Sequence, residues 1–118
     1  MTSFAEQVAD AKQRVREVSP DEVRAMRERG EAVTLVDVRE PQEYAQGHVP
    51  GAVPIPRGAI EHSAESQVPR DTPVVLYCAA GGRSALAADA LQRMGYTNVA
   101  SMRGGVQGWA DAGGEIES

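Results

Sequence analysis

What the sequence has little of excludes several classes of protein. The chain has 118 residues and one cysteine, which rules out an internal disulfide. Aromatic residues make up only 4%, so a core must be built from valine, leucine and alanine. Lys12 is the single lysine and no basic tract occurs, which argues against sequence-independent binding to nucleic acid. The unbroken apolar runs are far too short to span a membrane.

The overall composition is that of one globular domain. A chain of this length forms a single core and buries roughly two-thirds of its unfolded surface. Apolar residues make up 42% and charged residues 25%, with a formal net charge of -5. The N-terminal segment mixes charges throughout and lacks the apolar centre of a signal peptide. We therefore expect a cytoplasmic protein that contacts no membrane.

Two helices are predicted near the N-terminus. An apolar stripe with helical spacing predicts a charged helix over residues 4–17, and we expect residues 1–17 to be a helical extension of the domain. The stripe consists of Phe4, Val8, Ala11 and Val15. Ser19-Pro20-Asp21-Glu22 then combines a capping hydroxyl, an N-terminal proline and a capping-box glutamate. This second helix should end at Gly30.

Apolar strands alternate with helices in the rest of the chain. Residues 32–38 and 74–77 are nearly continuous apolar runs, typical of strands that are buried on both faces. A further strand is expected within residues 96–102, and helices at 41–46, 84–94 and 106–112. Residues 47–56 should be irregular with a short strand at 52–54, and residues 57–73 a long loop with one helical turn. The alternation predicts an α/β sandwich around a mostly parallel sheet, with helices on both faces.

The single cysteine lies where such a fold concentrates its chemistry. Cys78 directly follows the 74–77 strand, and Ala79-Ala80-Gly81-Gly82-Arg83-Ser84 leads into a helix. The two glycines let the loop curl, so that backbone N–H groups and the helix dipole converge on the sulfur. These features favour a reactive thiolate, although a lone cysteine is more often a buried structural residue.

Other polar residues have structural as well as functional interpretations. Asp37 and Arg39 follow the first buried strand, where we expect them to fix the strand end by pairing. Arg83 either supports a bound anion or forms a salt bridge with Glu43 or Glu40. No cluster of histidine, cysteine and acidic residues has metal-ligand spacing, so we predict no metal site and no cofactor.

Three segments resemble the motifs of rhodanese domains, in the expected order. Residues 37–52, DVREPQEYAQGHVPGA, resemble the N-terminal motif, and residues 78–84, CAAGGRS, resemble the active-site loop. Residues 91–109, with Gly95-Tyr96, Val99, the pair Gly104-Gly105 and Trp109, resemble the C-terminal motif. The resemblance extends over about residues 18–113. It implies a three-layer rhodanese-like sandwich over residues 18–118.

The resemblance also implies a sulfurtransferase. Cys78 would take sulfane sulfur from a small anionic donor such as thiosulfate and become a persulfide. An external thiol, cyanide or a protein acceptor would then remove that sulfur. The backbone amides of residues 79–84 (Ala79, Ala80, Gly81, Gly82, Arg83 and Ser84) would bind the persulfide anion, with Asp37 and Arg39 in supporting roles.

Two other functions remain open at this point. A cysteine phosphatase or arsenate reductase uses a similar loop, but it holds one more residue between cysteine and arginine than the four found here. A non-catalytic interaction or regulatory module is the second alternative. Inactive members of the family typically lack the cysteine or have a degraded loop, and this chain keeps both.

Overall fold

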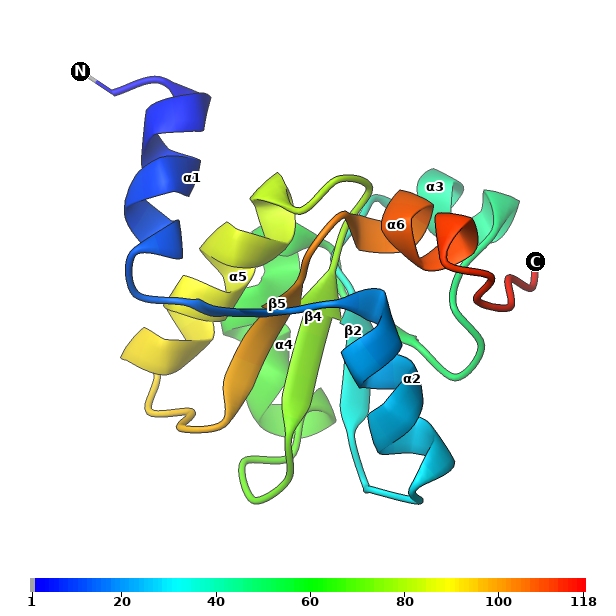
Figure 1. Cartoon of the computed structure of the whole chain (residues 1–118). Coiled ribbons are helices and arrows are strands. Elements are labelled where there is room, and N and C mark those ends of the chain that lie inside the picture. The colour runs from blue at the N-terminus through cyan, green and yellow to red at the C-terminus, as the bar shows by residue number, and fades with distance from the viewer. Residues whose placement is uncertain (1) are drawn as a thin grey trace.

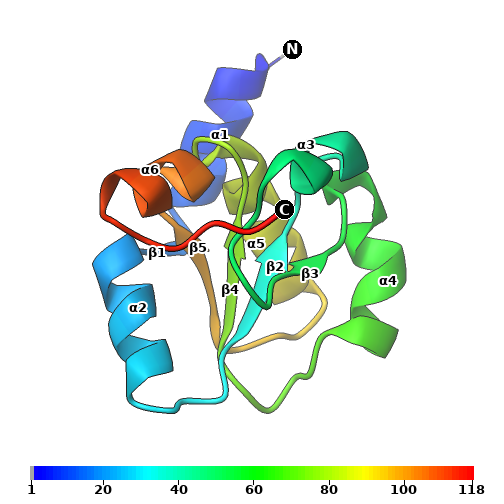
Figure 2. The same cartoon turned by 90° about the vertical axis from the view of Figure 1, so that its right-hand side faces the viewer.

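The computed structural model describes residues 2–118 as a five-stranded parallel sheet between two layers of helices (Figures 1 and 2). The strand order is β1-β5-β4-β2-β3. The strands are β1 (Arg16–Val18), β2 (Thr34–Asp37), β3 (Val53–Pro54), β4 (Val74–Tyr77) and β5 (Val99–Met102). The helices are α1 (Phe4–Lys12), α2 (Pro20–Glu28), α3 (Pro41–Gln46), α4 (Ile60–Gln67), α5 (Gly82–Arg93) and α6 (Gly105–Asp111), with a short 3₁₀ helix, η1 (Arg57–Ala59). The predicted α/β sandwich is confirmed.

Local capping explains where the first helices begin. The Ser19 hydroxyl accepts the backbone N–H of Glu22, and the Glu22 carboxylate accepts that of Ser19 in return. Ser3 and Glu6 form the same capping box at the start of α1. Each box satisfies two backbone N–H groups that would otherwise lack partners in the first turn. The predicted start of the second helix is therefore confirmed.

The first helix is shorter than predicted. It ends at Lys12, and residues 16–18 form β1, which pairs in parallel with β5. The prediction of helix over residues 4–17 is thus wrong for its last part. Val15, the last residue of the predicted apolar stripe, is buried although it lies beyond the end of α1. The apolar spacing therefore continues past the helix, and it predicts a longer helix than the one that forms.

The predicted loop over residues 57–73 is also wrong in part. It contains η1 and the two-turn helix α4, in which Ile60 and Ala64 are fully buried. These two side chains are four residues apart and so share one helix face, which packs onto the sheet side covered by α5. The short strand predicted at 52–54 is confirmed as β3.

Alternating side chains of the central strand divide the core between the two faces of the sheet. In β4, Val74 and Leu76 belong to a cluster with residues of α4 and α5. Val75 and Tyr77 face a second cluster, which includes Val23 of α2 and Trp109 of α6. Cys78 continues the alternation and lies in the first cluster. The strand register therefore points the cysteine toward α5.

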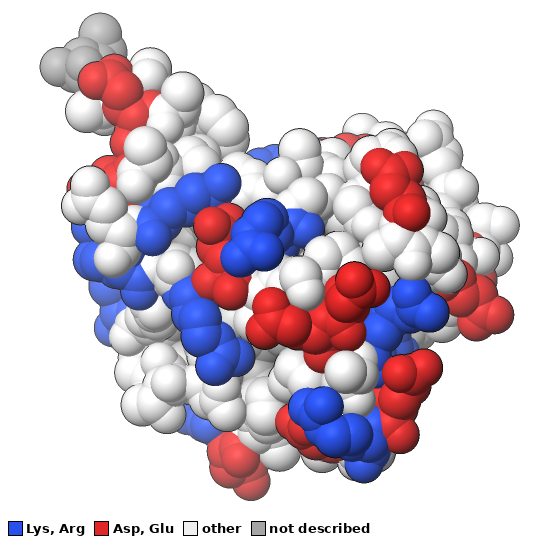
Figure 3. Space-filling model, viewed as in Figure 1, with Lys and Arg blue, Asp and Glu red and all other residues white. Residues whose placement is uncertain are grey.

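Surface charge shows no strong separation on the face seen in Figure 3, where acidic and basic side chains are interspersed. Within residues 2–118, no helix has the length and apolar character needed to cross a membrane. The same residues contain no group of three or more histidine, cysteine or acidic side chains arranged to hold a metal ion.

Candidate active site

Cys78 lies at the carboxyl end of β4, where the chain turns into α5 through the loop seen at the top of Figure 1. Only 1% of the residue is exposed. Parallel sheets bind ligands beyond this end of their strands, as expected from the sequence. The cysteine therefore lies just beneath the surface of the expected site.

The sulfur of Cys78 lies within hydrogen-bonding distance of a backbone N–H and a hydroxyl group. The backbone N–H of Gly81 donates to Sγ at 3.0 Å, and the Ser84 hydroxyl lies 3.5 Å from it. Ser84 Oγ is in turn 2.8 Å from Ser101 Oγ of β5. Both serines are fully buried, so these hydroxyls have no competing solvent. If Ser101 donates to Ser84, the Ser84 proton is directed to a thiolate.

These contacts determine the protonation of the thiol. Burial raises the pKa of Cys78, but the hydrogen bonds from the Ser84 hydroxyl and from the backbone of Ser84, Gly81 and Ala80 outweigh it. The net effect is a pKa below the usual value of a thiol. Hydrogen bonds to the charged form favour that form, so the loop stabilises an anion on the sulfur.

The two glycines of the loop are present for different reasons. Gly81 has φ +114°, in the left-handed region that other residues rarely adopt. Gly82 has no such backbone conformation, so the expectation that both glycines serve the curl holds for Gly81 alone. At Gly82 the restriction is packing, because a Cβ there would lie 3.3 Å from the ring of Phe4.

The start of α6 holds the cysteine backbone from the other side. The N–H of Val106 donates to the carbonyl of Cys78 at 2.8 Å. Gly105, with φ +58°, lies so close that a Cβ would overlap the carbonyl oxygens of Cys78 and Ala79. A glycine is therefore required here, and it fixes the first two residues of the loop against α6.

Arg83 pairs with an acidic residue of α3. Its two terminal nitrogens lie 2.8 and 3.1 Å from the two carboxylate oxygens of Glu43. This bond, together with the N–H of Glu40, lowers the pKa of Glu43 to about 2. The salt bridge considered from the sequence is thus formed, with Glu43 as the partner. It connects α3 to the first turn of α5, which directly follows the cysteine loop.

Asp37 and Arg39 form a buried ion pair at the end of β2. The Arg39 guanidinium contacts both carboxylate oxygens of Asp37, with its closest nitrogen at 2.8 Å, and also donates to the carbonyl of Gly47. The expected pairing at the strand end is therefore present. It anchors Gly47, the residue that directly follows α3.

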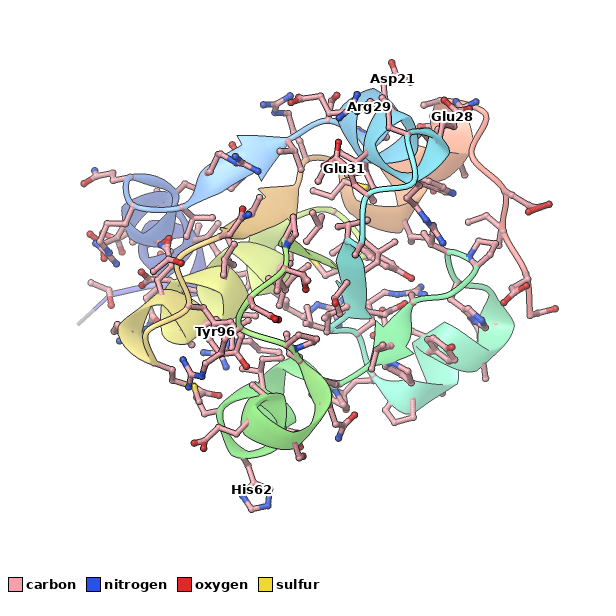
Figure 4. The ribbon with its side chains drawn as sticks, turned by 90° about the horizontal axis from the view of Figure 1, so that it is seen from below. Asp21, Glu28, Arg29, Glu31, His62 and Tyr96 are labelled. Carbon is pink, nitrogen blue, oxygen red and sulfur yellow. The ribbon has the colours of Figure 1, made fainter. Side chains whose placement is uncertain are left out.

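Among the residues that the structure describes, neither histidine nor Trp109 is hydrogen-bonded to the Cys78 sulfur. His62 is on α4 and points away from the body of the protein, as Figure 4 shows. His48 stacks on the ring of Tyr44 with centroids 3.7 Å apart. Trp109 lies in the core on the α6 side of the sheet and donates to the carbonyl of Glu115.

Sequence reasoning missed two residues of the site, Ser101 and Gly105. A signal existed for Ser101, which is a hydroxyl within the otherwise apolar Val99–Met102 strand. A buried polar side chain in such a strand needs a partner, and here that partner is Ser84. Gly105 belongs to the glycine pair of the C-terminal motif, and nothing in the sequence indicated that it lies against Cys78.

A large hollow in the described surface lies away from the cysteine loop. A cavity of about 520 Å³ lies at the opposite end of the strands, beside Pro73 and Asn98. Figure 4 views the protein from this side and labels two of the lining residues, Arg29 and Glu31. The walls carry charges of both signs and no nucleophile, so we assign the site from the cysteine loop and not from cavity size.

Known proteins resemble this chain in sequence. The family model of the rhodanese-like domain matches residues 19–112. A sulfurtransferase from Allochromatium vinosum is 43% identical over 83 residues, covering 70% of this chain and 77% of that protein. The probable adenylyltransferase/sulfurtransferase MoeZ of Mycobacterium tuberculosis is 37% identical over 95 residues. That match covers 79% of this chain and only 24% of MoeZ.

Solved structures resemble it in fold. A protein of unknown function from Rhodopseudomonas palustris, described as a possible tyrosine phosphatase, has a TM-score of 0.90 at 34% identity and covers 99% of this chain. The match extends over 96% of that protein. A thiosulfate sulfurtransferase from Pseudomonas aeruginosa has a TM-score of 0.80 at 35% identity, covering 86% of this chain and 20% of its own.

Proposed function

The chain belongs to the family of rhodanese-like domains, and we propose that it carries sulfane sulfur as a persulfide on Cys78. Its sulfurtransferase relatives support sulfur transfer as the general function. The observation that carries the finer proposal is the buried Cys78 sulfur, which accepts the Gly81 N–H at 3.0 Å and has a lowered pKa. A buried structural cysteine has no need of such anion stabilisation.

The reaction proceeds in two displacements. The Cys78 thiolate attacks the outer sulfur of a donor such as thiosulfate, forming an S–S bond while the donor's own S–S bond breaks. The electron pair of that bond leaves with sulfite. A thiolate or cyanide then attacks the outer sulfur of the persulfide, and the Cys78 thiolate departs. The Gly81 N–H and the Ser84 hydroxyl stabilise the sulfur anion at the start and the end of the cycle.

The charges of the loop bear on the choice of donor. Ala79 and Ala80 bring no charge, and Arg83, the one charged residue between Cys78 and Ser84, is paired with Glu43. Binding of an anionic donor therefore depends mainly on the loop amides. The sequence contains no second cysteine to receive the sulfur, so the acceptor is an external thiol, cyanide or a protein.

A phosphatase activity is the second candidate, because the similar structure from Rhodopseudomonas palustris is described as a possible tyrosine phosphatase. Two features speak against it. Only four residues separate Cys78 from Arg83, which suits a single sulfur atom better than a tetrahedral phosphate. A phosphatase also needs an acid that protonates the leaving group. The buried carboxylate of Asp37 is paired with Arg39 and is not free for that role.

The test is the mass of the intact protein after incubation with thiosulfate or 3-mercaptopyruvate. We expect a gain of one sulfur atom, which cyanide removes as thiocyanate, and no gain in the Cys78→Ser variant. A serine oxygen cannot form a persulfide, and the substitution hardly changes the side-chain volume. An unchanged mass with both donors would favour a non-catalytic module, and turnover of an aryl phosphate would favour the phosphatase.

A further inference from the structure

Helix α1 lies outside the matched family region of residues 19–112, yet it packs along α5, the helix that begins at the reactive loop (Figure 1). Its C-terminal end is firmly attached. Nε and one terminal nitrogen of Arg14 donate to the two carboxylate oxygens of Asp89 at 3.1 and 2.9 Å. The Gln92 side chain donates to the Arg14 carbonyl, and Ala11 is buried. This anchor fixes the direction of α1 relative to α5.

The other end of α1 reaches the loop. Phe4 is 58% exposed, but its ring edge lies against Gly82. A Cβ on Gly82 would be 3.3 Å from two ring atoms of Phe4 and 3.5 Å from a methyl group of Val8. An aromatic side chain at the end of a charged helix, more than half in solvent, has little stability to gain from its position. Its contact with the loop is the feature that needs explanation.

The loop needs an external contact at this point. Gly81 and Gly82 are consecutive, and glycine has the widest backbone freedom of any residue. The hydrogen bond that opens α5, from Ala85 N–H to the Gly81 carbonyl, is long at 3.4 Å. Yet the N–H of Gly81 must stay directed at the Cys78 sulfur. The peptide between Gly81 and Gly82, which directly follows that N–H, is thus held only by a long hydrogen bond, and Phe4 and Val8 lie against Gly82.

We propose that α1 is a positioning element of the active site: through Phe4 it holds Gly82, and with it the Gly81 N–H, against the sulfur of Cys78. Phe4 acts through the loop and does not touch the reacting atoms. The proposal rests on the proposed function for its effect on sulfur transfer. Its effect on thiol reactivity stands independently of that function.

The experiment measures the rate of Cys78 alkylation by iodoacetamide against pH in the full chain. In Phe4→Ala we expect the alkylation rate to fall about fivefold at pH values well below the pKa of Cys78, as for the loss of one ordinary hydrogen bond. The plateau of the rate at high pH should be undiminished. A loosened loop disfavours the thiolate but does not block access to it, so only the rate at low pH should fall. A change in the burial of Cys78 would instead alter the plateau at high pH. Gln7→Ala, an exposed change on the same helix, should leave the profile unchanged.

Two further variants make the inference specific. Gly82→Ala should displace the Phe4 ring and lower the alkylation rate as Phe4→Ala does. The rate of the double variant should fall by less than the product of the two single effects, because both substitutions act on one contact. Phe4→Leu keeps an apolar contact and should restore most of the rate. Thermal melting monitors folding throughout, and an unchanged profile in folded Gly82→Ala overturns the proposal if Phe4→Ala unfolds.

Identical alkylation profiles for folded Phe4→Ala and the unmodified protein would overturn the proposal, as would fully multiplicative effects in the double variant. A shifted profile in a protein that accepts sulfur from no donor would overturn the sulfurtransferase function and leave the role of α1 standing. Persulfide formation together with unchanged alkylation profiles would support the sulfurtransferase function and overturn the role of α1.

Discussion

Removal of the Ser84 hydroxyl gives the most direct test of how the site stabilises its anion. Ser84 Oγ lies 3.5 Å from the Cys78 sulfur and 2.8 Å from the Ser101 hydroxyl, and all three groups are buried. Ser84→Ala deletes only the hydroxyl oxygen and keeps a good helix former at the start of α5. The Gly81 N–H remains in place. The substitution therefore isolates one of the contacts to the sulfur.

The expected magnitude follows from the strength of a hydrogen bond to a charged group, about 1.5–3 kcal/mol. Because the distance of 3.5 Å between the Ser84 hydroxyl and the sulfur is long, we take the lower energy of about 1.5 kcal/mol. This energy corresponds to about a tenfold change in the thiolate population. Alkylation proceeds through the thiolate. At pH values well below the pKa of Cys78, the rate for Ser84→Ala should therefore fall about tenfold.

The assay is the pH profile of iodoacetamide alkylation, with thermal melting as a check on folding. Ser101→Ala should lower the rate in the same pH range less, because it changes only the orientation of the Ser84 proton. Ser66→Ala removes an exposed hydroxyl of α4 and serves as the control. An unchanged profile in folded Ser84→Ala would refute the reasoning and leave the backbone amides as the sole source of thiolate stabilisation.

Two further predictions concern the supports of the loop. Gly105→Ala should lower the free energy of unfolding by about 2 kcal/mol or more and also lower sulfur transfer, because the added Cβ overlaps the carbonyls of Cys78 and Ala79. Chemical denaturation measures this loss of stability. Gly58→Ala is the control and should be neutral, because a Cβ at Gly58 meets nothing within 4 Å. Arg83 lowers the pKa of Glu43 from 4.5 to about 2, so the pair stabilises the fold above pH 4.5 and that stabilisation is lost as the pH falls toward 2. Glu43→Gln should therefore make the melting temperature depend less on pH over that interval. The effect should be small, because the side chains of the pair are one-third exposed. An unchanged dependence of the melting temperature on pH would show that the pair adds nothing to folding.

The sequence was sufficient for features that depend on neighbouring residues. The capping box at Ser19, the apolar run of β4 and the position of Cys78 before a glycine loop are all local patterns. Helix α4 was missed because Ile60 and Ala64 form a weak apolar face that gains its stability from packing, not from intrinsic propensity.

Features that depend on distant residues were less accessible. The contact between Ser84 and Ser101 joins residues 17 positions apart, and the clamp of Gly105 on Cys78 joins residues of different layers. Neither spacing has a local pattern in the sequence. The ion pair between Arg83 and Glu43, by contrast, was one of two alternatives suggested by charge alone, and the fold selects between them.

The position of β1 has a consequence for how the chain acquires its structure. β1 comes first along the chain among the strands, but its neighbour in the sheet is β5, which comes last. During synthesis, residues 16–18 have no sheet partner until residues 99–102 have emerged from the ribosome. Such non-local pairing slows folding, because a long loop must close before any contact compensates for the lost entropy. Nascent chains that lack β5 should therefore leave β1 undocked. Because β5 also carries Ser101, the partner of Ser84, the cysteine should acquire its reactivity only when almost the whole domain has been made.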